Sequence, residues 1–168
     1  VRRTTAQKDD KSQKMGNIFK NAIRPMSSGP QIKGTAVYVA LEVAVSKLLR
    51  TIMKADNKTI AELAVVHGLS LGLMGGVGAS MNNPEETVLP YGEKSSRRQI
   101  VQGAKGIPAL FLAQYIYQTF FTGFSMTFWS IKDALIMAAA KILTRPIAAK
   151  LYGSNKFLQN SLDAQQFL

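Results

Sequence analysis

Small residues recur at every fourth position between residues 64 and 80, and this spacing constrains the fold more than any other feature of the chain. The series is Ala64, Gly68, Gly72, Gly76 and Ser80. Residues four positions apart share one face of a helix, so the series forms a narrow stripe of small side chains. Each interior glycine costs about 1 kcal/mol relative to alanine in water, whereas in lipid the backbone must satisfy itself and small residues let helices approach closely. The series therefore predicts a glycine-zipper helix packed against another helix in a membrane.

Two apolar segments, residues 63–81 and 106–131, are long enough to span a membrane. At 1.5 Å per residue they would extend about 28 and 39 Å, compared with about 30 Å for the hydrocarbon core of a bilayer. We therefore predict an all-α fold built around a transmembrane helical hairpin at residues 59–131, with a polar loop at 82–105. Thr59 followed by Glu62 has the spacing of a capping box and predicts where the first helix starts.

A row of polar side chains follows the second segment at the same four-residue spacing. Gln114, Gln118 and Thr122 begin the row, and Met126 and Ser130 continue it. We expect this row to face the glycine zipper, where each hydrogen bond between helices would contribute about 0.6 kcal/mol. The alternative is that the row faces a neighbouring subunit.

The segments before the hairpin are basic. Residues 1–34 are polar and cationic and predict a flexible arm, whereas residues 35–58 predict an amphipathic helix that lies on a surface. Its expected apolar stripe is Val37, Leu41, Ala44, Leu48 and Ile52, and its expected cationic face is Lys47, Arg50, Lys54 and Lys58. Such a face suits an anionic lipid surface or a protein partner, and the alternative is an ordinary solvated face.

After the hairpin, residues 132–168 predict a short interfacial helix and a tail. The apolar run from Ala134 to Leu143 is too short to cross a bilayer, and Arg145-Pro146 is expected to end it. Trp129 and Lys132 resemble an interfacial anchor at the end of the second span.

The distribution of charge predicts an orientation in the membrane. The chain up to Lys58 has twelve basic residues against four acidic ones, and residues 132–168 have five against two, whereas the loop at 82–105 has four against three. By the positive-inside rule, both termini should lie on the positive side, which is the cytoplasm, an organelle matrix or a virion interior.

The sequence offers little reactive chemistry. Residues 68–72 match the G-x-S-x-G pattern of a nucleophile elbow, but that motif requires a strand, a sharp turn and a helix, whereas here it lies inside a predicted span. The chain has no cysteine and one histidine, His67. We therefore expect no catalytic residues, no metal site and no cofactor. A histidine in a membrane segment is nonetheless a candidate ligand for haem or a pigment, and the alternative that we favour is a His67 bonded to a backbone carbonyl or to Glu62.

These features favour a non-enzymatic integral-membrane structural subunit of a large multiprotein assembly. Its expected partners are lipid, other membrane subunits and, through the basic arm, nucleic acid or acidic protein. An energy-converting complex of an organelle inner membrane and a membrane-associated virion protein both fit. Three alternatives remain open: an oligomeric pore, a haem- or pigment-binding anchor using His67, and a soluble helical shell protein.

Overall fold

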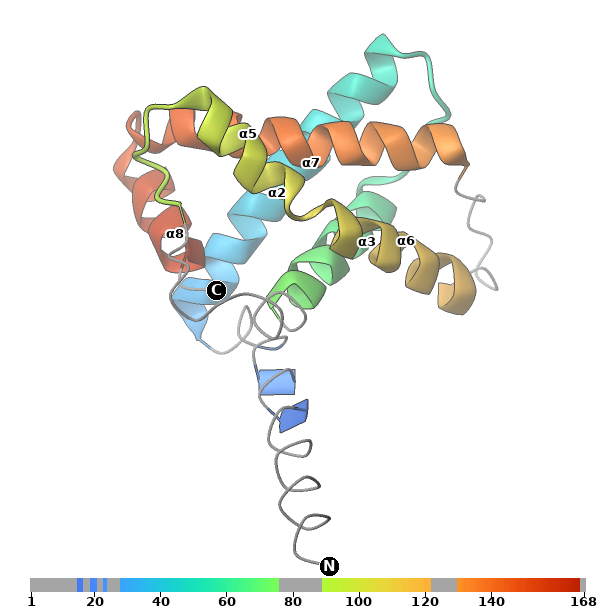
Figure 1. Cartoon of the computed structure of the whole chain (residues 1–168), viewed down its shortest axis with the longest axis horizontal. Coiled ribbons are helices and arrows are strands. Elements are labelled where there is room, and N and C mark those ends of the chain that lie inside the picture. The colour runs from blue at the N-terminus through green and yellow to red at the C-terminus, as the bar shows by residue number, and fades with distance from the viewer. Residues whose placement is uncertain are drawn as a thin grey trace, which may run out of the picture.

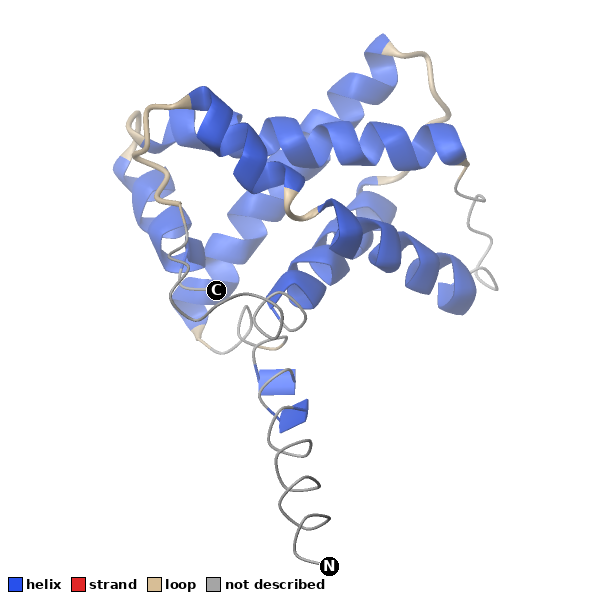
Figure 2. Cartoon of the chain, viewed as in Figure 1, coloured by secondary structure: helices blue, strands red, loops and turns tan. Residues whose placement is uncertain are grey.

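A computed structural model describes residues 15–16, 19–20, 23, 28–75, 89–121 and 130–166, and the described residues form helices and loops without a strand (Figure 1, Figure 2). The all-α prediction is confirmed. In chain order, the helices are α2 (Gly29–Ile52), α3 (Ile60–Leu73), α5 (Ser96–Ala104), α6 (Ile107–Phe121), α7 (Ile131–Tyr152) and α8 (Lys156–Gln166).

Helix α2 packs against α3, α7 and α8 and connects the two halves of the core (Figure 1). It begins within the segment predicted as a flexible arm, because the Ser28 side chain caps it by accepting a hydrogen bond from Gln31 N at 3.3 Å. Pro30 in the first turn needs no hydrogen-bond partner for its nitrogen. The helix ends before Lys54, which has a left-handed φ of 50°.

The orientation of α2 is the reverse of the one predicted from its pattern. Leu48 and Ile52 of the expected apolar stripe are exposed, whereas Glu42, Ser46 and Arg50 are buried against α3 and α7. The predicted division of the helix into an apolar stripe and a cationic surface is therefore not what the structure has, since Arg50 lies inside and Leu48 and Ile52 lie outside. The polar side chains of α2 are buried because they find polar partners on other helices, which the pattern of one helix cannot reveal.

Helices α3 and α6 pack against each other, and Figure 1 shows that they cross. The start of α6 lies at the end of α3, because a Cβ added to Gly106 would come 2.8 Å from Met74 Sδ. Thr59 and Glu62 form the predicted capping box at the start of α3. The core between the two helices consists of Leu63, Val66, Leu110, Ala113 and Tyr117.

In the described part of the chain, we find no helix with both the length and the apolar character needed to cross a membrane. Helices α3 and α6 have 14 and 15 residues. Residues 76–81 and 122–129, which would complete the two predicted spans, lie outside the described residues. The transmembrane hairpin therefore stays a prediction.

The packing of α5 differs from the predicted topology. The hairpin placed residues 82–105 on the opposite side of the membrane from residues 132–168, but α5 lies directly against α7 (Figure 1). Gly103 permits this contact, since a Cβ there would lie 2.9 Å from Lys141 O and 3.0 Å from Ile142 O. The close approach between helices thus occurs at Gly103.

Helix α7 continues through the residues that were expected to end it. It has 22 residues, begins with a capping box between Ser130 and Asp133, and contains Pro146 in its interior. Pro146 has no N–H to offer the Ile142 carbonyl, which lies beside Gly103 of α5. The prediction of a short helix ending at Arg145-Pro146 was wrong because tertiary contacts on both sides hold the helix in place.

Candidate functional site

A polar cluster lies at the centre of the molecule, where α2, α3 and α7 meet. Glu42 Oε1 accepts a hydrogen bond from Lys141 Nζ at 3.1 Å, and its Oε2 lies against His67 Nδ1. On the other side of the imidazole, His67 Nε2 lies 3.0 Å from Ser46 Oγ. All four side chains are buried. The cluster therefore ties three helices together through charged and hydrogen-bonding groups.

The protonation pattern of this cluster follows from its contacts. Nδ1 of His67 faces the Glu42 carboxylate and Nε2 faces the Ser46 hydroxyl, so one ring nitrogen can donate and the other can accept. Burial by itself would raise the pKa of the Glu42 carboxyl, but Lys141 and His67 outweigh burial and hold that pKa below its ordinary value. Glu42 is therefore an anion that neutralises Lys141.

Ser46, His67 and Glu42 stand in the order of a nucleophile, a base and an orienting carboxylate. In a hydrolase the nucleophile must also reach a substrate. Ser46 Oγ is fully buried and points at Met137 Sδ, 3.5 Å away. The serine of the G-x-S-x-G pattern, Ser70, is also buried, on α3 rather than at a strand-to-helix turn. Neither serine is placed for acyl transfer in this conformation.

The same geometry bears on His67 as a candidate cofactor ligand. Both of its ring nitrogens face protein groups, and the imidazole is completely buried. A haem or pigment would have to displace Ser46 or Glu42 to reach it. Among the described residues, no group of three or more His, Cys, Asp or Glu side chains is arranged to hold a metal ion.

The four residues predicted as a lipid or partner surface occupy different environments. Arg50 is buried and donates to Asp133 Oδ1 at 2.6 Å, and Lys58 is buried with its Nζ 3.9 Å from Asp133 Oδ2. Lys47 is half-buried and donates to Asn57 Oδ1 at 2.9 Å, whereas Lys54 is exposed. The predicted continuous cationic face is therefore not formed, because Asp133 on α7 draws Arg50 and Lys58 inward.

The small residues of the zipper do not make the predicted close contact in the described structure. Ala64, Gly68 and Gly72 are half-buried, and a Cβ added to Gly68 would meet nothing within 4 Å. Gly76 and Ser80 lie outside the described residues. Gly68 therefore borders open space within the described part of the chain, whereas Ala64 packs against the core.

The polar row of α6 is only partly directed at α3. Gln114 is buried on the face of α6 that contacts α3, and its Nε2 has no hydrogen-bond partner among the described residues. Gln118 is half-buried, and Thr122 lies outside the described residues.

A second polar cluster fixes the loop before α5. Arg145 on α7 donates from Nε to Gln99 Oε1 at 2.9 Å and from Nη2 to Leu89 O, and its guanidinium stacks 3.8 Å above the Tyr91 ring. Burial raises the pKa of the Tyr91 hydroxyl. Gln99 in turn donates to Pro90 O at 3.0 Å. The loop is thus held between α5 and α7.

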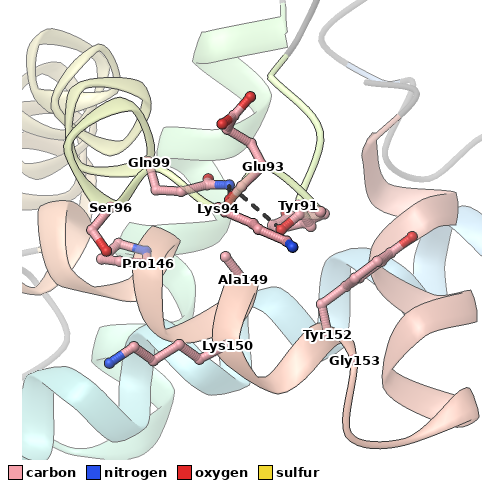
Figure 3. A pocket seen from close by; sticks show the side chains of 11 residues that line it. Tyr91, Glu93, Lys94, Ser96, Gln99, Pro146, Ala149, Lys150, Tyr152 and Gly153 are labelled. Carbon is pink, nitrogen blue, oxygen red and sulfur yellow. Dashed lines mark hydrogen bonds between the residues drawn. The ribbon is translucent and has the colours of Figure 1, made fainter.

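A pocket of about 340 Å³ lies beside this loop (Figure 3). Lys94 and Ala149 face its middle, and Lys150 extends along one side. Glu93, also at the pocket, is paired with Arg98 at 3.1 Å. The pocket is open, and Tyr152 in its lining donates a hydrogen bond to Asp163 Oδ1 at 2.6 Å.

The outer face of α6 is apolar and aromatic. Tyr115 is 68% exposed and Phe120 is 72% exposed, and Phe111 and Leu112 are also exposed on the same helix. Monomeric soluble proteins rarely expose contiguous apolar surface of this kind, and a larger patch marks a surface that binds protein or membrane.

Sequence reasoning missed Glu42 and Ser46 as the partners of His67, and it missed Lys141 as the partner of Glu42. The available signal was the presence of a single charge within an apolar helical stretch, which describes both Glu42 and Lys141. Lone charges of opposite sign in apolar stretches have to find each other or reach solvent.

Comparisons of the chain with protein-family models, curated proteins and solved structures found no match.

Proposed function

We propose that the protein is a non-enzymatic structural subunit that is built into a larger multiprotein assembly through the outer face of α6. The observation that carries this proposal is the exposure of large aromatic and aliphatic side chains on that helix, including Tyr115 and Phe120. Leaving such surface in water costs about 25 cal/mol for each Å² that a neighbour would otherwise cover. A neighbouring protein that covers this face of α6 removes that free-energy cost, so the face is suited to an interface between subunits.

The interior of the molecule supports a structural role. Charged residues that usually lie on surfaces are buried here as pairs, Glu42 with Lys141 and Arg50 with Asp133, while large apolar residues lie outside. Buried pairs of this kind contribute little net stability but penalise every arrangement that separates the partners. They therefore suit a subunit that must present fixed outer faces to its neighbours.

The membrane hairpin belongs to this proposal as one version of it. It requires residues 76–81 and 122–129 to extend α3 and α6, with lipid and neighbouring helices sharing the apolar faces of the pair. Gly68, where an added Cβ would meet nothing within 4 Å, would then be available to a helix of another subunit.

The proposal is tested by site-specific photo-crosslinking in the assembly isolated from its natural source. A photoreactive phenylalanine analogue replaces Tyr115 or Phe120 on the outer face of α6, and the matched control carries it at Lys150, which is exposed at the far end of α7. We expect adducts with unlike proteins from the two α6 positions, in a particle many times heavier than the 18.3 kDa chain. Fewer or no adducts should form from position 150.

Two other results would overturn the proposal. Adducts only with other copies of this chain would identify a homo-oligomer and make the pore the leading function. A monomer without adducts at positions 115 and 120 would show that α6 has no protein neighbour.

The non-enzymatic part of the proposal has its own test. A fluorophosphonate reacts with serines that are both activated and accessible, so we expect no labelling of the native protein at Ser46. Labelling that His67→Ala abolishes would show that the Ser46–His67–Glu42 cluster opens to substrate.

A further inference from the structure

One end of the molecule combines exposed apolar side chains with lysines. This end, called the basic end below, is where α2 finishes and where α3 and α7 begin (Figure 1). It consists of Ile52, Met53, Lys54, Ile60, Ile131 and Lys132, all of which are exposed.

Polar contacts hold these segments together. Lys132 Nζ donates to Met53 O at 3.4 Å, which places the first turn of α7 beside the end of α2. Arg50 and Lys58 both reach Asp133, so the connection from α2 to α3 also lies against the start of α7. The basic end is therefore one surface assembled from three parts of the chain.

The charge of this surface is positive. Five cationic side chains lie in or directly beneath it, against three carboxylates. The cations are Lys47, Arg50, Lys54, Lys58 and Lys132, and the carboxylates are Asp56, Glu62 and Asp133. Lys54 and Lys132 are exposed and pair with no carboxylate among the described residues. Glu62 and Asp133 are occupied in capping boxes.

The apolar part of this surface is unusually exposed. Ile131 is 82% exposed, and Ile52, Met53 and Ile60 surround the same helix ends. Apolar side chains flanked by lysines match the boundary between anionic headgroups and acyl chains. A protein partner of acidic character would match the lysines but would gain less from four protruding apolar side chains at helix ends.

We propose that the basic end docks on an anionic lipid surface, with Lys54 and Lys132 at the headgroups and Ile52, Met53 and Ile131 inserted at the acyl boundary. This contact goes beyond the proposed function, because it names lipid as a second partner on a surface separate from the outer face of α6. It also differs from the surface predicted from the sequence, since Arg50 and Lys58 act beneath it as supports.

The test measures flotation of the purified full chain with vesicles of phosphatidylcholine alone or with about 30 mol% phosphatidylglycerol. We expect binding to the anionic vesicles that weakens as salt is raised. Lys54→Gln/Lys132→Gln should bind about 30-fold more weakly, as expected for the loss of two lysines near the lipid surface. Lys94→Gln/Lys150→Gln is the matched control, because it removes the same charge from exposed residues at the pocket (Figure 3).

Insertion has a separate readout in Trp129, the single tryptophan of the chain. Trp129 precedes Ile131 by two positions in the sequence. We expect brominated lipids to quench its fluorescence in wild type and to quench it less in Ile131→Ser. Leu143→Ser, on the other half of α7, should leave the quenching unchanged.

Three results would overturn this inference. Equal binding to neutral and anionic vesicles would remove the role of charge. Wild-type binding by Lys54→Gln/Lys132→Gln would assign the attraction to the basic residues 1–34, and equal weakening by both double variants would show only a general effect of net charge. None of these results bears on the crosslinks from α6, so the two proposals fail independently.

Discussion

Glu42 on α2 and Lys141 on α7 are 99 positions apart in the sequence and form an ion pair in the centre of the fold, with 3.1 Å between Oε1 and Nζ. The two residues are 0% and 2% exposed. His67 lies on the other side of the carboxylate, so one anion serves partners on two helices. The position of α7 relative to α2 and α3 is therefore specified by charge as well as by apolar packing.

Removing one member of this pair should strongly destabilise the protein. Lys141→Met leaves the Glu42 carboxylate buried without its cation, and we expect a loss of about 3–5 kcal/mol in the free energy of unfolding, measured with urea. In Glu42→Gln/Lys141→Met the amide oxygen of Gln still accepts from His67 while no charge remains unpaired. This double variant should recover most of the loss. If the double variant is no more stable than Lys141→Met, then the unpaired Glu42 carboxylate is not the cause of the lost stability.

Stability should fall in acid through the two buried carboxylates. Interactions with basic and hydrogen-bonding partners outweigh burial and hold the pKa of both Glu42 and Asp133 below their ordinary values. The unfolded chain therefore binds more protons near pH 4, where free carboxyls titrate, and the stabilisation is complete above about pH 5. It is lost as the pH falls below about 4 towards the folded pKa values. Urea unfolding between pH 7 and pH 3 measures this loss.

Glu42→Gln supplies the control for the acid dependence. Its free energy of unfolding should vary less with pH below 5 than that of wild type, whereas Glu93→Gln, at a partly exposed carboxylate, should keep the wild-type slope. An unchanged slope in Glu42→Gln would show that other carboxyls cause the acid sensitivity.

Two glycines should respond in opposite directions to the same substitution. A Cβ at Gly103 would come within 2.9 Å of the α7 backbone, so Gly103→Ala should destabilise the fold by about 1–3 kcal/mol. At Gly68 a Cβ meets nothing within 4 Å, so Gly68→Ala should stabilise α3 by up to about 1 kcal/mol in the isolated chain. Thermal unfolding of both variants tests this prediction. If Gly68→Ala lowers the melting temperature, then another helix lies close to Gly68, as the glycine zipper predicts.

Arg50 and Lys54 should differ although the sequence places both on one cationic face. Arg50→Met leaves Asp133 without its closest partner in a buried site and should cost about 3 kcal/mol of unfolding free energy. Lys54→Met changes an exposed side chain and should stay within about 0.5 kcal/mol of wild type. Equal effects in urea unfolding would contradict the buried position of Arg50.

The sequence by itself determined the features that depend on neighbouring residues. The capping box of Thr59 and Glu62 and the helical character of residues 35–52, 63–73 and 107–121 follow from spacings of three or four residues. Helix caps and helix faces are set within one or two turns, so a local pattern is sufficient to predict them.

Only the tertiary structure decided which face of α2 is buried, which glycine makes the close contact and what His67 binds. Each of these depends on a residue far away in the chain: Asp133 for Arg50, the α7 backbone for Gly103, and Glu42 and Ser46 for His67. A charged side chain is costly to bury alone and acceptable to bury with its counter-ion, so its location follows from a partner that the local pattern does not contain.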